Sequence, residues 1–197
     1  MTLSIMGKYK RILLKLSGEA LASTDNTIDP DTLNKVVNII QSAIDQKVEV
    51  GIVIGGGNIF RGAALAQAGM NRITGDHMGM LATVINALAI ADACKKNKIN
   101  ALVMSGFPIG GGVCDPVDHN KAKQALSEGK VVIFSAGTGS PCFTTDTGAV
   151  LRAIEIDADI VFKATKVDGV YTDDPMKNPD ATRYETLGFD EAIEKNR

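Results

Sequence analysis

The stretch GIVIGGGNIFRG, residues 51–62, joins an apolar β-rich run to three consecutive glycines and then to an arginine. Glycines that follow a strand commonly bind phosphate through backbone N–H groups, but the Lys-Ser/Thr pair that ends a P-loop is absent here. If this loop binds phosphate, the positive charge has to come from other positions. Arg61 is the first candidate, because a guanidinium can form two parallel hydrogen bonds with phosphate oxygens.

On both sides of this stretch, β-rich runs alternate with helical patterns. We expect strands at 11–17, 48–55, 100–105, 130–136 and 158–164, and helices at 31–46, 76–96, 118–128 and 145–156. This alternation predicts a single α/β domain over residues 1–197, a three-layer sandwich with a mainly parallel central sheet flanked by helices. Ligands of such sheets bind beyond the carboxyl ends of the strands. Glycines follow four of the five predicted strands, at positions 18, 55–57, 106, 137 and 139.

The composition narrows the class of ligand. The 197 residues are 45% hydrophobic and 22% charged, with a formal net charge of −2, so a long nucleic-acid or anionic-membrane surface is not expected. The three cysteines, Cys94, Cys114 and Cys142, are widely spaced and form no CxxC pair, which argues against a disulfide framework and a zinc site. With no leader and no apolar run of membrane-spanning length recognised, we expect a soluble, cytoplasmic protein that binds a small anion through a local cluster of charge.

Two lysines interrupt apolar strands, Lys15 in RILLKLSG and Lys163 in DIVFKATK. A lysine in a buried strand is unfavourable unless its charge is paired or a ligand supplies an anion. The alternative is a lysine on an edge strand that reaches solvent. Together with Arg61, these lysines would supply the charge that the glycine loop lacks.

The segment SAGTGSPCFTTDT, residues 135–147, combines glycines, hydroxyl groups and one acid between a strand and a helix. One interpretation is a turn that ends in a helix N-cap at Thr144 or Thr145, with Asp146 favoured at the positive end of the helix. The other is functional: the Asp146 carboxylate beside two strand lysines could hold both ammonium groups in place.

The segment DGVYTDDP, residues 168–175, is either a plain surface loop or a loop whose tyrosine lines a nucleotide base pocket. Neither histidine, His77 or His119, belongs to a metal cluster, and we expect both to be non-catalytic. No candidate for a general base was recognised in the sequence, and this favours a phosphate as the acceptor. A phosphate acceptor is mostly a dianion at neutral pH, so no residue has to remove a proton from it. Two glycine-rich anion loops with two lysines and an arginine therefore fit a kinase that acts on a phosphate or a carboxylate.

Five segments, YKRILLKLSGEAL, GGGNIFRG, GDHMGMLATVINALA, SAGTGSPCFTTDT and KATKVDGVYTDDP, together resemble the bacterial UMP kinases (uridylate kinases) of the amino acid kinase family, in the right order from Tyr9 to Arg197. The resemblance implies the amino acid kinase fold and transfer of the ATP γ-phosphoryl group to UMP, which gives UDP and ADP. It implies that Lys15, Lys163, Asp146 and Arg61 are catalytic. It implies an ATP site formed by Lys15, Leu16, Ser17, Gly18, Gly57, Arg61, Thr165, Tyr171 and Asp174. It implies a UMP site formed by Gly56, Asp76, Thr138, Gly139, Ser140, Pro141, Cys142, Phe143, Thr144 and Thr145.

The resemblance also implies Mg²⁺ carried mainly by the ATP phosphates, with no metal ligands assigned to the protein, a homohexamer, and feedback inhibition by UTP. The chain departs from the family pattern at Ser140 and Cys142, where the family usually has Asn and an aromatic residue. Ala91 and Leu102 stand where GTP-binding arginines are expected, which predicts weak or absent GTP activation. The family continues for tens of residues beyond FDEAIEKNR, so we expect the chain to lack C-terminal strands and a helix.

Three rival interpretations remain. The first is a carboxylate kinase of the same fold, such as a glutamate or aspartate kinase, although Asp76 would repel an amino-acid carboxylate. The second is a non-catalytic nucleotide-sensing module, against which the presence of Lys15, Lys163 and Asp146 argues. A dinucleotide-binding dehydrogenase is weaker still, because no G-x-G-x-x-G opens the first helix.

Overall fold

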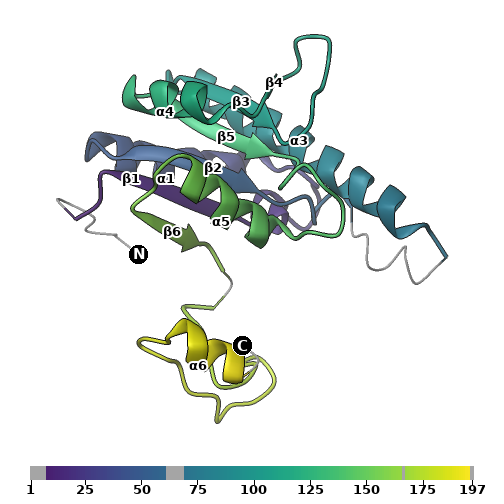
Figure 1. Cartoon of the computed structure of the whole chain (residues 1–197), viewed down its shortest axis with the longest axis vertical. Helices are drawn as coiled ribbons and strands as arrows, with labels where there is room; N and C mark the ends of the chain where they lie inside the picture. Colours follow the sequence, from purple (N-terminus) through teal and green to yellow (C-terminus); the bar gives the residue numbers. More distant parts are fainter. Residues whose placement is uncertain (1–7, 61–68, 166, 196–197) are drawn as a thin grey trace. The chain divides into compact units, whose positions relative to one another are not determined.

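The computed structural model of the chain describes residues 8–60, 69–165 and 167–195. The chain forms two compact units, Met1–Ala164 and Thr165–Arg197, and each is described by itself. In the described ranges, the first unit contains the sheet with helices on it, and the second contains a short helix and turns (Figure 1). The single domain over 1–197 stays a prediction.

The first unit is built on a six-stranded sheet with the order β4-β3-β5-β2-β1-β6. The strands are β1 (Arg11–Leu16), β2 (Glu49–Ile54), β3 (Ala101–Ser105), β4 (Asp115–Pro116), β5 (Val131–Ser135) and β6 (Ile160–Lys163). Every strand pair is parallel. The five predicted strands are confirmed to within two residues at each end. β4 was not predicted, because it is only two residues long and lies at the edge of the sheet, where a proline is tolerated.

The helices of the first unit follow the predicted alternation. They are α1 (Pro30–Asp45), α3 (Arg72–Lys96), α4 (His119–Ser127) and α5 (Thr145–Glu155), with a short 3₁₀ helix η1 (Gly18–Leu21) after β1. One boundary was wrong: α3 begins four residues before the predicted position 76. Asn71 caps it, because its side chain accepts hydrogen bonds from the backbone N–H groups of Ile73 and Thr74.

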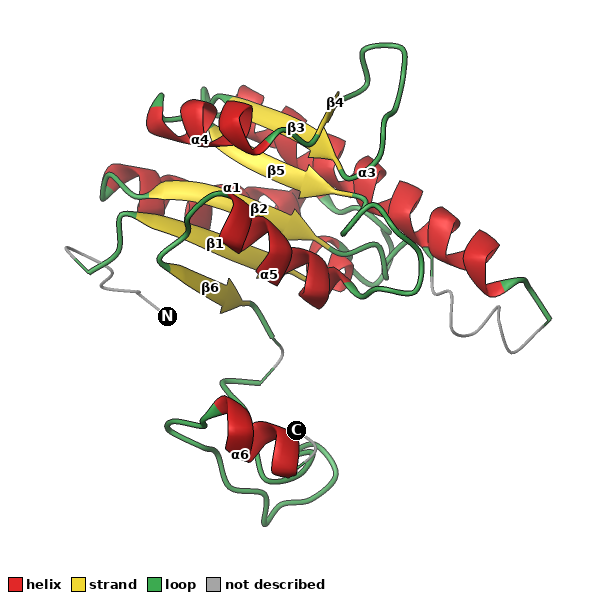
Figure 2. Cartoon of the chain, viewed as in Figure 1, coloured by secondary structure: helices red, strands yellow, loops and turns green. Residues whose placement is uncertain are grey.

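Helices cover both faces of the sheet (Figure 2), with α1 and α3 on one face and α4 and α5 on the other. Two buried clusters fill the two layers. Ile52 and Ile54 of β2 belong to the cluster under α1 and α3, whereas Val53, between them, belongs to the cluster under α4 and α5. This is the two-residue periodicity of a strand buried on both faces. The predicted three-layer α/β sandwich is confirmed.

Helix α3 is long and apolar enough to span a membrane by length and composition, but half of its apolar window is buried inside the protein. It packs on α1, β3 and β5, so it is a core helix of the sandwich. A second apolar stripe on α3, formed by Met78, Leu81, Ile85 and Leu88, is exposed in this chain, with between 38% and 50% of each residue accessible.

The second unit consists largely of turns. An antiparallel bridge joins Tyr171 to Arg183, and the helix α6 (Phe189–Glu194) follows. The segment 168–175 is irregular apart from that bridge, as its turn residues predict. The sequence analysis did not predict α6, which is only six residues long.

Candidate active site

Three charged side chains meet at the carboxyl end of the sheet. The Nζ atom of Lys15 lies 2.7 Å from Oδ1 of Asp146, and Nζ of Lys163 lies 2.9 Å from Oδ2. Lys15 is buried, with 11% of its side chain exposed, while the Lys163 and Asp146 side chains are about half exposed. One carboxylate therefore joins two ammonium groups, as the functional interpretation of Asp146 requires, and its catalytic role stays a prediction.

The strand register explains this arrangement. β1 and β6 are parallel neighbours, and Lys15 lies opposite Lys163 in the ladder. Residues paired in this way point to the same face of the sheet, and Leu13, two residues before Lys15, packs in the cluster under α4 and α5. Asp146 lies in the first turn of α5, which covers that face. Lys163 lies on an edge strand and is half exposed, as the alternative interpretation predicted, but it still forms an ion pair with Asp146.

The pKa of the Asp146 carboxyl reflects both its burial and its partners. Burial by itself raises this pKa, but hydrogen bonds and charge from Lys15 and Lys163 outweigh burial and hold it below its usual value. The carboxylate is therefore ionised at neutral pH, as a bridge between two cations requires.

Two glycine loops meet at the same edge. A Cβ atom on Gly18 would lie 2.4 Å from Oδ1 of Asn58, 2.7 Å from the Gly55 carbonyl oxygen and 2.8 Å from the Gly57 nitrogen. Any side chain at Gly18 would therefore force the two loops apart. Ser17 caps η1, since its Oγ accepts a hydrogen bond from the Glu19 N–H, and Leu16 is buried at the end of β1.

Gly56 and Gly57, the second and third glycines of the triple-glycine loop, differ in their surroundings. Among the described residues, none comes within 4 Å of a Cβ built on Gly57, so none of them blocks the approach of a ligand to the backbone there. A Cβ on Gly56 would lie 2.8 Å from the Gly79 carbonyl oxygen and 2.9 Å from Cβ of Ala82. Gly56 therefore allows close packing on α3, and its predicted contact with UMP stays a prediction.

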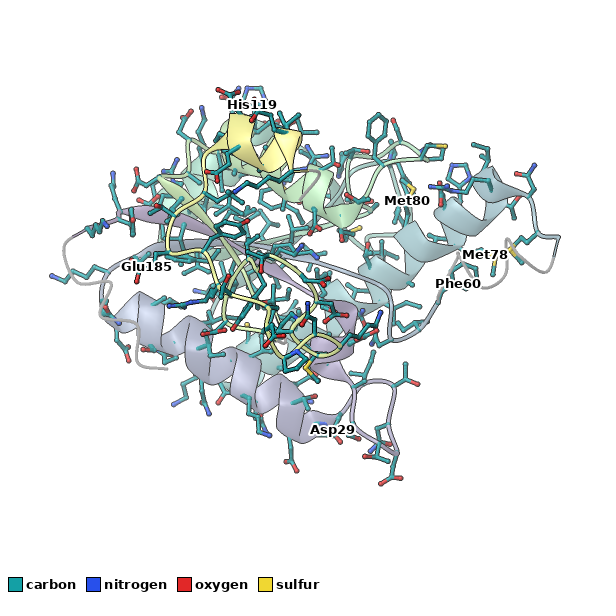
Figure 3. The ribbon with its side chains drawn as sticks, turned by 90° about the horizontal axis from the view of Figure 1, so that it is seen from below. Asp29, Phe60, Met78, Met80, His119 and Glu185 are labelled. Atoms are coloured by element: carbon teal, nitrogen blue, oxygen red, sulfur yellow. The ribbon has the colours of Figure 1, made fainter. Side chains whose placement is uncertain are left out.

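A cleft of about 160 Å³ lies between α3 and the loop that follows β5. Its walls include five of the ten residues predicted to bind UMP: Asp76, Thr138, Ser140, Phe143 and Thr145. Met80 also lines it, while Met78 lies on another side of the same helix (Figure 3). Because Thr145 immediately precedes Asp146, the cleft and the lysine pair are neighbours.

Asp76 connects the two walls of the cleft. Its Oδ2 accepts a hydrogen bond of 2.7 Å from the Cys142 N–H, and both of its oxygens lie 2.9 Å from Nε of Arg72. Burial alone would raise the pKa of Asp76, but Arg72 and the Cys142 N–H lower it overall. Asp76 lies in the second turn of α3, which Asn71 caps, and not at the start of the helix, where the predicted range 76–96 placed it.

The remaining residues of the predicted UMP site shape the loop. Thr144 caps α5, as expected, by accepting a hydrogen bond from the Thr147 N–H. Gly139 has φ +88° and packs directly on Gly106, where a Cβ would lie 2.1 Å from the carbonyl oxygen. Cys142 has φ 70° and donates its N–H to Asp76. Pro141 lies in the same turn and is partly buried, between the exposed Ser140 and Cys142.

Four predicted residues fall elsewhere. Arg61 lies outside the described residues. Thr165, Tyr171 and Asp174 belong to the second unit, where Thr165 Oγ1 donates to the Val167 carbonyl oxygen and Tyr171 donates a 2.7 Å hydrogen bond to Asp168. Asp174 accepts a hydrogen bond from the Met176 N–H. Their predicted contacts with ATP stay predictions.

The sequence analysis missed three polar residues beneath the loops: Asn58, Thr83 and Asn86. Thr83 and Asn86 are 2% and 0% exposed in the otherwise apolar middle of α3. A signal was available, because buried polar side chains need hydrogen-bond partners and these two lie three residues apart on one helix face.

Comparisons with known proteins identify the family of the chain. Residues 10–197 match the model of the amino acid kinase family. The chain is 79% identical over 192 residues to the uridylate kinase of Ruthia magnifica subsp. Calyptogena magnifica, covering 98% of this chain and 80% of that protein. It is 58% identical to the uridylate kinase of Photobacterium profundum, with coverage of 95% and 78%.

Among solved structures, the UMP kinase from Bacillus anthracis superposes with a TM-score of 0.90 at 40% sequence identity, covering 95% of this chain and 78% of that one. The UMP kinase from Ureaplasma parvum superposes with a TM-score of 0.89 at 38% identity, with coverage of 96% and 80%. The chain belongs to the amino acid kinase family.

Proposed function

We propose that this protein transfers the γ-phosphoryl group of ATP to UMP, giving UDP and ADP. The observation that carries the proposal is the cluster of Lys15, Lys163 and Asp146 beside a cleft that contains a second carboxylate, Asp76. Relatives named uridylate kinase, at up to 79% identity, support the same assignment.

In the reaction, a phosphate oxygen of UMP forms a bond to the γ-phosphorus of ATP. The bond from that phosphorus to the bridging oxygen breaks, and its electron pair stays on the β-phosphate of ADP. UMP is mostly a dianion at neutral pH, so no residue has to remove a proton. The protein's task is to position the two nucleotides and to stabilise the negative charge of the transferring group.

The two lysines are suited to that task. Lys15 and Lys163 present two cations at one point of the sheet edge, and Asp146 fixes the position of both before substrate binds. Such preorganised charge needs no reorientation during the reaction, which is the main source of electrostatic catalysis. Arg61, from the loop after the triple glycine, is proposed as a further cation for phosphate.

Mg²⁺ is proposed to arrive on the ATP phosphates, where it neutralises part of their charge. The donor set fits this role, because both oxygens of Asp146 are engaged by ammonium groups. The described parts of the chain contain no group of three His, Cys, Asp or Glu residues that could hold a metal by themselves.

The acceptor is proposed to be UMP because of the groups that line the cleft. The Asp76 carboxylate can accept hydrogen bonds from ribose hydroxyls, and Thr138 and Thr145 can pair with O4 and N3–H of uracil. Cytosine reverses that donor and acceptor pattern, which leaves buried polar groups unpaired. An amino-acid carboxylate would be repelled by Asp76, which disfavours a glutamate or aspartate kinase.

The assembly is proposed to be a homohexamer in the cytoplasm. The exposed apolar stripe of Met78, Leu81, Ile85 and Leu88 on α3 supports self-association, because contiguous exposed apolar surface marks interaction sites. We also propose UTP as a feedback inhibitor. Light scattering on the purified protein tests the assembly, and inhibition of UMP turnover by added UTP tests the regulation.

The substrate assignment is tested with a panel of acceptors. Purified protein is mixed with ATP, Mg²⁺ and one of UMP, dUMP, CMP, AMP or glutamate, and release of ADP is followed. The expected order is UMP far above CMP, with AMP and glutamate inactive. Equal turnover of CMP and UMP, or a preference for glutamate, would overturn the assignment. ATP and UMP binding without turnover would favour a nucleotide-sensing module.

A further inference from the structure

Asn86 is fully buried on α3, and within the described residues its side-chain amide forms its hydrogen bonds with one loop. Its Nδ2 donates to the Gly55 carbonyl oxygen at 2.7 Å and to Oδ1 of Asn58 at 2.7 Å. Its Oδ1 accepts a hydrogen bond of 3.0 Å from Nδ2 of Asn58. Both amides thus bind each other, and Asn86 also holds the backbone at the start of the triple glycine.

Asn58 extends this contact to a second loop. Its Nδ2 also donates to the Thr27 carbonyl oxygen at 2.8 Å, in the loop before α1. Its Oδ1 lies where a side chain on Gly18 would have to be. The Asn58–Asn86 pair therefore sets the spacing between the two glycine loops at the ends of β1 and β2.

Thr83 makes the corresponding contact with the acceptor loop. Its Oγ1 accepts a 2.6 Å hydrogen bond from the N–H of Ala136, the first residue after β5, and donates to the Met80 carbonyl oxygen at 2.7 Å. Ala136 has φ 57°, in the left-handed region that is unfavourable for a non-glycine residue. The hydroxyl of Thr83 helps to hold this unfavourable turn at the entry to the loop that lines the cleft.

The two contacts come from one face of one helix. Positions 83 and 86 are three residues apart, so they are neighbours on the α3 surface. The strands whose ends they contact, β5 and β2, are adjacent and parallel in the sheet. The glycine loop of the ATP side and the cleft loop of the UMP side are therefore both hydrogen-bonded to the same rigid element.

We propose that Thr83 and Asn86 are positioning residues: together they fix the acceptor loop that begins at Ala136 relative to the glycine loop that begins at Gly55. This proposal rests on the proposed function, since it assigns the acceptor to the first loop and the donor phosphates to the second. Phosphoryl transfer depends on the alignment of donor and acceptor, and a misplacement of about 1 Å can cost 10²-fold in rate. Buried polar groups here have a purpose that apolar packing could not serve.

The test uses substitutions that change hydrogen bonding with little change in shape. Asn86→Asp removes both donors and sets a carboxylate oxygen against two acceptors, and we expect kcat to fall at least tenfold at saturating ATP and UMP. Thr83→Val removes the hydroxyl, and we expect a rise of threefold or more in KM for UMP with KM for ATP unchanged. Thr83→Ser keeps the hydroxyl and should recover most of what Val loses.

Controls separate positioning from stability. Ile90→Val removes one buried methyl group from the same helix and should lower Tm without lowering kcat. If Asn86→Asp fails to fold, the half-buried Asn58→Ala removes the same contact from the loop side and should lower kcat at least tenfold.

Wild-type kcat and KM in Asn58→Ala and Thr83→Val would overturn the proposal. The proposal would also be overturned if Asn58→Ala and Thr83→Val lose no more activity than Ile90→Val does, with each variant assayed the same number of degrees below its own Tm. The kinetic constants of the variants and the wild type are measured with whichever acceptor of the panel the wild-type protein phosphorylates. A failure of UMP as substrate would therefore contradict the proposed function, while the effect of Thr83 and Asn86 would still be measured.

Discussion

Asp146→Asn is the substitution that most sharply tests the lysine pair. The change keeps the shape of the side chain but removes its charge, and it sets an NH₂ group against one of the two ammonium groups now 2.7 Å and 2.9 Å from the carboxylate oxygens. A hydrogen bond to a charged group is worth about 1.5 to 3 kcal/mol. The Lys163 pair is half exposed and should contribute below about 1 kcal/mol, whereas Lys15 is buried.

We therefore expect the free energy of unfolding to fall by roughly 2 to 4 kcal/mol, since one well-buried and one exposed charged contact are lost. We expect kcat to fall about 10²-fold, because misplacing a preorganised cation costs about 2.7 to 4 kcal/mol in the transition state. KM for ATP and UMP should change far less, as Asp146 positions the lysines and is not proposed to contact substrate.

The assay combines denaturant unfolding with steady-state kinetics at saturating ATP and UMP. Asp157→Asn is a matched control, because Asp157 forms an exposed ion pair with Lys123 at the other end of α5; its Tm and kcat should stay close to wild type. A kcat for Asp146→Asn within threefold of wild type, in a folded protein, would refute the reasoning.

The pH dependence of folding stability provides a second test of Asp146→Asn. The pKa of Asp146 is lowered in the folded protein from an ordinary value of 3.8. Its contribution to stability is therefore fully present above that ordinary value and is lost as the pH falls through the folded pKa. The stability gap between wild type and Asp146→Asn should be constant near neutral pH and should narrow in acid below about pH 4. A gap that does not change in acid would contradict the pairing.

Three further predictions follow from the site. Lys15→Met and Lys163→Met should each lower kcat by about 10² or more with folding retained; near-wild-type kcat in either variant removes that lysine from catalysis. dUMP should be disfavoured about tenfold or more in kcat/KM, since it lacks one hydrogen bond to Asp76, and Asp76→Asn should reduce this preference; an unchanged UMP-to-dUMP ratio would exclude the ribose contact. GTP should raise kcat little or not at all, because Ala91 and Leu102 stand where binding arginines are expected; a several-fold rise at fixed ATP and UMP would show this to be wrong.

Much of the fold was predictable because the two patterns that indicate it, apolar runs and the glycines that follow them, are local in the sequence. Buried parallel strands are short apolar runs, and the glycines mark the points where each strand turns at the ligand edge. The ion pairs of Lys15 and Lys163 with Asp146 were also foreseeable as a possibility, because a lysine within a buried strand requires an anionic partner. Its register required the structure, since the neighbours of β1 come from distant parts of the sequence.

The start of α3 was not predictable in the same way. Ile73, Thr74 and Gly75 are poor helix formers and conceal the first turn, so the helix was predicted to start only at Asp76. The double use of Asp76, which holds the Cys142 N–H across the cleft, is a tertiary contact between residues 66 positions apart. The Asn58–Asn86 pair is likewise visible only when the chain is folded, since neither amide reveals its partner in the sequence.

The most direct test of the central claim follows the phosphoryl group itself. Protein, Mg²⁺, UMP and ATP labelled with ³²P in the γ-phosphate are mixed, and the products are separated. The account predicts that the label appears in UDP, that transfer requires UMP, and that Lys15→Met and Lys163→Met reduce it about 10²-fold or more. Label that appears only as inorganic phosphate, or that is transferred to glutamate in preference to UMP, would contradict it.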